Sequence, residues 1–143
     1  MMSSGRLLIA IAVLAVIGAA VSSVSLYHHY QTTETNYCDF GQNFNCDIVN
    51  RSIYSTIAGI PVALIGICGY LALLGLATVW RSKPETPKIL LAASIAGLGF
   101  ALYLTYIEGF VLGTWCVLCL TSLTMITLIA LLSSVLFAKT RKA

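Results

Sequence analysis

Charged side chains are scarce in this 143-residue sequence: 8 lysines and arginines and 5 aspartates and glutamates make up 9% of the chain, and hydrophobic residues make up 59%. Soluble globular domains have about 25% charged and roughly 45–50% apolar residues. With a mean hydropathy of +0.93, this shortage excludes a soluble domain and predicts a single helical membrane domain over residues 1–143. The net charge of +3 does not indicate nucleic-acid binding, because the basic residues cluster in short flanks.

Uncharged apolar runs occupy four stretches of the chain, residues 7–26, 53–80, 89–107 and 109–138. Each reaches or approaches the ~20 residues that cross a bilayer as a helix. None alternates polar with apolar residues as the strands of a membrane barrel do. We therefore predict an all-α integral membrane protein, a four-transmembrane-helix bundle with an external loop at residues 27–55. The predicted spans are residues 7–26, 56–80, 89–107 and 114–137.

The positions of the basic residues predict the orientation in the membrane. Seven of them lie at the termini or between the second and third runs: Arg6, Arg81, Lys83, Lys88, Lys139, Arg141 and Lys142. Arg51 lies on the other side, with Glu34, Asp39, Asp47 and Glu108. The positive-inside rule then places both termini in the cytoplasm of a plasma or inner membrane, with the loop outside. We expect Glu108 to be solvated at the end of its span.

Three local features refine this topology. The first run resembles a secretory signal, but its apolar part is longer than a typical signal core, so we interpret it as a span. Pro61 predicts that a short interfacial element precedes a helix starting near this residue. Ala93 and Gly97 form a small-x-x-x-small face suited to close helix packing.

The cysteines converge on one side of the predicted membrane. Cys116 and Cys119 open the last run at its external end, and positions three apart share one side of a helix. Cys38 and Cys46 lie in the external loop, so four of the five cysteines face the oxidising compartment, where disulfides persist. We expect Cys68, inside the second run, to be a small buried core residue.

This arrangement has three interpretations: a redox relay, inert structural disulfides, and a zinc-thiolate site. A disulfide between helix positions three apart closes a tiny loop and stabilises little. The spacing C-x7-C is uncommon among zinc sites, and we interpret His28 and His29 as interfacial rather than as a metal pair. We favour the relay, because a helix N-terminus promotes the thiolate and thiol–disulfide exchange moves electrons between cysteines in contact.

The motifs also occur in a distinctive order, which is Cys38-x7-Cys46, Ser52, Gly59-Ile60-Pro61 and finally Cys116-x-x-Cys119. This ordered set resembles the vitamin K epoxide reductase family, in its bacterial and archaeal branch, over about residues 7–138. The resemblance implies a four-helix bundle around a membrane quinone of the ubiquinone, menaquinone or phylloquinone type. It also implies a thioredoxin-like partner that donates electrons and supports disulfide formation in exported proteins. No thioredoxin-like domain is attached, so we expect this partner to be a separate chain.

Roles for individual residues follow from the resemblance. Cys119 matches the cysteine that faces and attacks the quinone, and Cys116 matches its partner. Cys46 matches the loop cysteine that exchanges with Cys116, and Cys38 matches the one that meets the protein substrate. Ser52 matches a loop serine near the active site.

Hydroxyl side chains are the candidate donors to the quinone oxygens, namely Ser52, Tyr54, Tyr103 and Tyr106. An unrelated bacterial disulfide oxidase also has four spans and two external cysteine pairs, but its C-x-x-C comes first along the chain. In this chain it comes last. Animal members of the resembled family have a tyrosine four residues past the last active cysteine, where this chain has Leu123.

Overall fold

The computed structural model describes residues 4–30, 56–57, 59–113 and 117–142. Its long helices are α1 (Ser4–Tyr30), α3 (Val62–Thr78), α4 (Thr86–Tyr106) and α5 (Val117–Lys142). A small sheet of β1 (Thr56–Ile57) and β2 (Ile60–Pro61) precedes α3, and the π-helix η2 (Ile107–Leu112) continues α4. The predicted helical class is therefore confirmed.

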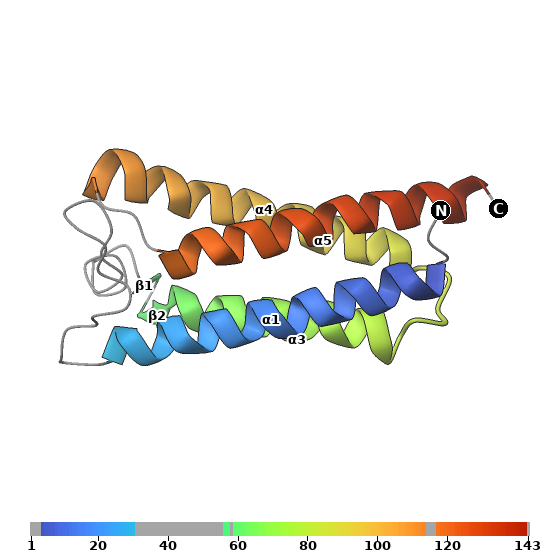
Figure 1. The fold of residues 1–143 in the computed structure, drawn as a ribbon, viewed down its shortest axis with the longest axis horizontal. Coiled ribbons are helices and arrows are strands. Elements are labelled where there is room, and N and C mark those ends of the chain that lie inside the picture. Colours follow the sequence, from blue (N-terminus) through green and yellow to red (C-terminus); the bar gives the residue numbers. More distant parts are fainter. Residues whose placement is uncertain (1–3, 31–55, 58, 114–116, 143) are drawn as a thin grey trace.

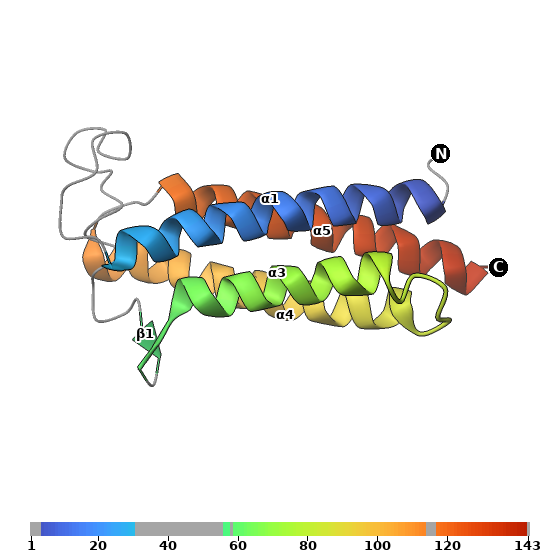
Figure 2. The same ribbon diagram turned by 90° about the horizontal axis from the view of Figure 1, so that it is seen from below.

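The four long helices lie side by side along the length of the molecule (Figure 1). Helix α1 packs against α3 and α5, and α4 packs against α3 and α5. Figures 1 and 2 show the start of α1, the end of α5 and the α3–α4 connection at one end of the molecule. The other end, which we call the hairpin end, contains β1, β2, η2, the end of α1 and the start of α5.

Length and composition suit three of the helical segments to crossing a membrane: Ser4–Tyr27, Thr86–Val111 and Val117–Arg141. Helix α3 is also apolar but shorter, at 17 residues, so a fourth span stays a prediction. Large apolar side chains also face outward on every long helix, among them Ile9, Val13, Leu71, Ile95 and Leu131. Lipid tails are as apolar as these side chains, so such surfaces suit a bilayer.

The second long helix, α3, does not begin at residue 56, where the second predicted span starts. Strands β1 and β2 pair antiparallel there, and Gly59 has a φ of +83° in the turn between them, a conformation that glycine adopts without steric cost. Helix α3 begins at Val62, directly after Pro61, because proline lacks the N–H that a helix interior requires. The short element expected before Pro61 is thus present.

The third helix begins earlier than the predicted residue 89. Thr86 opens α4, and its hydroxyl donates a hydrogen bond to the backbone carbonyl of Trp80. Pro87 lies in the first helical turn, where its missing N–H costs nothing. The connection between α3 and α4 is correspondingly short.

Glycines allow close approach between helices. A Cβ on Gly18 of α1 would lie 2.3 Å from the ring of Tyr70 on α3. A Cβ on Gly97 of α4 would lie 3.2 Å from Ile126 on α5, and Ala93 packs against the buried core one turn away. The close packing predicted for Ala93 and Gly97 is present.

The expectation that Cys68 is buried in the core is wrong, because its side chain is exposed on α3. In a soluble protein an apolar neighbourhood indicates burial, but in a membrane protein the outer surface is apolar too. The apolar run around Cys68 therefore carried no information about which way its side chain faces.

Candidate functional site

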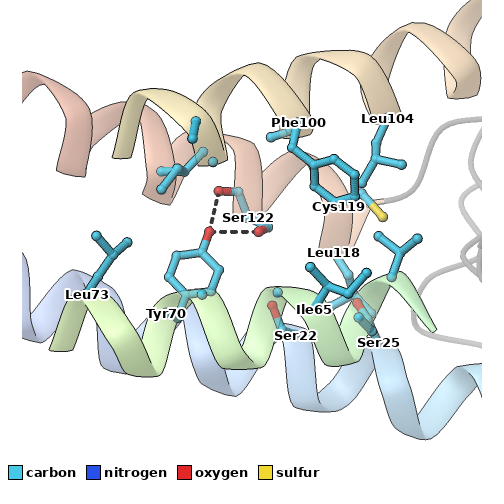
Figure 3. Close-up of a pocket in the computed structure, with 18 of the residues that line it drawn as sticks. Ser22, Ser25, Ile65, Tyr70, Leu73, Phe100, Leu104, Leu118, Cys119 and Ser122 are labelled. Carbon is cyan, nitrogen blue, oxygen red and sulfur yellow. Dashed lines mark hydrogen bonds between the residues drawn. The ribbon is translucent and has the colours of Figure 1, made fainter. Parts of the chain in front are cut away.

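A cavity of about 410 Å³ lies among all four long helices and η2. Its lining comes from the end of α1, the first three turns of α3, the last two thirds of α4 and the start of α5. The cavity therefore occupies the half of the molecule nearer the hairpin end. Its walls are largely apolar, with Ile65, Phe100, Leu104 and Leu118 among the lining side chains (Figure 3).

A few polar side chains interrupt this apolar wall: Ser22, Ser25, Tyr70, Glu108, Cys119 and Ser122. Ligand sites in proteins are typically apolar cavities of about 300–1,000 Å³ with a small number of placed polar groups. The cavity has both the size and the composition of such a site.

Tyr70 and Ser122 form the clearest polar contact in the cavity. The Tyr70 hydroxyl donates to the backbone carbonyl oxygen of Ser122 at 2.9 Å and lies 2.8 Å from Ser122 Oγ. Figure 3 shows these bonds crossing from α3 to α5. Gly18 of α1 sits against the Tyr70 ring, so three helices together fix the position of this phenol.

Cys119 lies on the same helix as Ser122. It is the third residue of α5, half-buried, and it lines the cavity. Positions 119 and 122 are three apart, so their side chains share one side of the helix within ~4.5 Å of axial rise. The predicted attacking cysteine is thus next to the hydroxyl pair, one turn nearer the hairpin end (Figure 3).

The expectation that Glu108 is exposed to solvent is also wrong. Glu108 is 1% exposed and lines the cavity from η2. The helical segment does not stop at residue 107, as predicted, but continues through η2 to Gly113, where φ is +66°. This continuation keeps Glu108 within the helical body instead of releasing it into a loop.

Two predicted quinone ligands lie away from this cavity. Tyr103 and Tyr106 are 55% and 58% exposed and are not among the lining residues. The ring of Tyr106 instead packs against Phe110, with 5.2 Å between centroids. The remaining predicted site residues, Cys38, Cys46, Ser52, Tyr54 and Cys116, lie outside the described residues.

Three residues that line the cavity were not predicted as site residues from the sequence: Tyr70, Ser122 and Glu108. Two of them carried a signal: Ser122 follows Cys119 by three positions, and an ionisable residue inside an apolar span marks a functional site by default. The sequence around Tyr70 carried a weaker signal, because a single tyrosine in an apolar run can lie on any face of a helix.

The fold and the cavity define a class of protein, a helical multi-pass membrane protein with a thiol side chain in the wall of a cavity among its long helices. The family model of the Vitamin K epoxide reductase family matches residues 9–134. The chain belongs to this family. Its members are in general quinone-linked disulfide oxidoreductases, and the chain is accordingly an oxidoreductase.

Proposed function

We propose that this protein transfers electrons from a separate thioredoxin-like protein to a membrane quinone. In this proposal electrons enter at Cys38, pass through Cys46 to Cys116 and Cys119, and leave to the quinone. The dithiol of Cys116 and Cys119 loses two electrons and two protons and becomes a disulfide, while the quinone gains both and becomes a hydroquinone. The single observation that supports this most is the position of Cys119 in the wall of the largely apolar cavity among the long helices.

The lining residues fit a quinone headgroup. A quinone is a flat apolar ring with two carbonyl oxygens, so it needs apolar walls and a small number of hydrogen-bond donors. The cavity supplies apolar walls, including the Phe100 ring, together with the hydroxyls of Tyr70 and Ser122. When bound, the quinone supplies the two-electron acceptor for the dithiol.

The hydroxyls of Tyr70 and Ser122 can donate one hydrogen bond to a quinone oxygen and still keep the hydrogen bond between the two hydroxyls. The two hydroxyls carry two protons, and one suffices for the 2.8 Å bond between them. The second proton is directed to the Ser122 carbonyl at 2.9 Å. That carbonyl belongs to an α-helix and has the i+4 backbone N–H as its regular partner, so Tyr70 can turn its proton toward a ligand.

Four spans and a cytoplasmic location of both termini complete the proposal. Helix α3 is short for a span, but the apolar residues of β1 and β2 extend the same segment toward the hairpin end. The start of α1 and the end of α5 lie at the opposite end (Figure 1). The basic residues gather there, so the positive-inside rule places that end in the cytoplasm. The cavity and the cysteine relay then lie toward the external side.

Quinone turnover tests this function. The purified protein in detergent, given a thiol reductant and a water-soluble ubiquinone or menaquinone analogue, should consume quinone absorbance. Cys119→Ala should abolish this activity, while Cys68→Ala should retain it, because Cys68 is exposed and does not line the cavity. Folded wild-type protein that leaves ubiquinone, menaquinone and phylloquinone analogues unreduced would refute the proposed activity.

A further inference from the structure

Glu108 is the acidic side chain among the described residues that line the cavity. It is 1% exposed, whereas Glu85, in the α3–α4 connection, is exposed. Placing an ionisable side chain inside a membrane is costly, and such residues commonly serve proton or ion transfer. The burial of Glu108 in the wall of a cavity that Cys119 also lines therefore calls for a chemical explanation.

The backbone around Glu108 is also unusual. Glu108 is the second residue of the π-helix η2, which ends at Gly113 in a left-handed conformation. Short π-helical segments are rare and occur frequently at functional sites. Here the segment keeps Glu108 in the cavity wall, where the other titratable lining residues are Cys119 and Tyr70. A carboxyl group, a thiol and a phenol therefore share one largely apolar cavity.

The chemistry of the proposed function, on which this inference depends, requires proton transfer inside that cavity. Cys119 is nucleophilic only as a thiolate, so its proton must move to a base. The quinone must in turn receive two protons on its oxygens as it is reduced to the hydroquinone. Bulk water is a poor carrier here because the cavity wall is largely apolar, so a side chain that can both accept and donate a proton is needed.

We propose that Glu108 is this proton-exchange residue. The S–H bond of Cys119 breaks, its electron pair stays on the sulfur, and its proton forms an O–H bond on the Glu108 carboxylate. Glu108 then gives that proton to a quinone oxygen and returns to the carboxylate. The second proton comes from the Cys116 thiol. The dithiol therefore loses two protons and two electrons and becomes a disulfide, and the quinone gains both and becomes the hydroquinone.

A thiol and a carboxyl that share a proton titrate as a coupled pair, which gives a readout independent of quinone. The test uses a full-length background in which the other four cysteines are alanine, so that only Cys119 reacts with iodoacetamide. The alkylation rate plotted against pH should rise in two steps. The first step follows the loss of one proton from the pair, because Cys119 is then a thiolate for part of the time while the remaining proton is shared with Glu108. The second step follows the loss of that shared proton, because Cys119 is then always a thiolate. Glu108→Gln should leave one step, and the matched exposed control Glu85→Gln should keep two.

The turnover assay supplies the second measurement, in protein that has all five cysteines. General acid–base groups contribute about 10²–10⁴-fold to rates, so Glu108→Gln should slow quinone reduction at least about 100-fold and Glu108→Asp should restore part of it. An alkylation profile that Glu108→Gln leaves unchanged would overturn the inference. So would full turnover in Glu108→Gln. A third outcome is a wild-type protein that does not reduce quinone but whose Cys119 alkylation rate still rises in two steps with pH. That outcome would refute the proposed function but would support proton exchange between Glu108 and Cys119.

Discussion

Replacing Gly18 by alanine perturbs the contact that positions Tyr70. A Cβ at this position would lie 2.3–2.5 Å from three atoms of the Tyr70 ring, whereas ordinary contacts begin near 3.4 Å. The ring must therefore move by roughly 1 Å, since neither helix backbone can easily give way in a packed interior. A displacement of this size disturbs the hydroxyl contacts at 2.8 and 2.9 Å with Ser122.

The cost can be built from its parts. Overpacking a well-packed interior costs about 1–3 kcal/mol, and an interhelical hydrogen bond in a membrane protein is worth about 0.6 kcal/mol, at most about 1.7. Against this, alanine is about 1 kcal/mol better than glycine in a helix. Gly75→Ala on α3 gains only this helix term, because nothing lies within 4 Å of its Cβ position. We expect Gly18→Ala to be less stable than Gly75→Ala by about 2–4 kcal/mol.

The assay is reversible unfolding in mixed micelles of detergent and SDS, followed by circular dichroism. A double-mutant cycle with Tyr70→Ala isolates the contact, because Gly18→Ala should cost little once the ring is gone. If Gly18→Ala were as stable as Gly75→Ala, the α1–α3 packing described here would be refuted. An equal cost with and without the Tyr70 ring would assign the effect to something other than this contact.

Two further substitutions test neighbouring parts of the site. Gly113→Ala should destabilise the protein by about 1–3 kcal/mol, because φ at Gly113 is +66° and alanine is strained there. The control is Gly99→Ala, because nothing lies within 4 Å of the Cβ position at Gly99. Equal unfolding midpoints for the two variants would contradict this expectation. Tyr70→Phe should weaken quinone binding about 5–10-fold, the size of one hydrogen bond, with Tyr27→Phe, exposed on α1, as control. Unchanged quinone affinity by fluorescence quenching would remove the Tyr70–Ser122 pair from the binding site.

Much of the fold could be predicted from the sequence, because apolar runs without charge have few alternatives to membrane helices. The runs at residues 7–26 and 89–107 lie within α1 and within α4 and η2, and Pro61 marks the start of α3. Hydropathy does not give the rotation of a helix about its axis, because lipid-facing and core-facing surfaces are both apolar. This is why Cys68 was assigned to the core and lies exposed.

The candidate site was predicted where the chemistry is local in sequence. Cys119 and its place near one end of the last helix follow from the C-x-x-C motif and the apolar run. Tyr70, on another helix, reaches Ser122 across the cavity, and such a contact depends on the helix arrangement. Glu108 was misplaced because the end of an apolar run was interpreted as the end of a helix, whereas the helical backbone continues through η2.

The central claim is that the cavity beside Cys119 binds the quinone, and photolabelling tests it most directly. A quinone analogue with an azide on its ring would be irradiated with the detergent-solubilised protein, and the labelled peptides identified by mass spectrometry. We expect labels on the cavity-lining turns of α3 and α5, around Tyr70 and Ser122, and we expect excess native quinone to suppress them. Suppressible labelling confined to the outer face of α4, at Tyr103 and Tyr106, would contradict it.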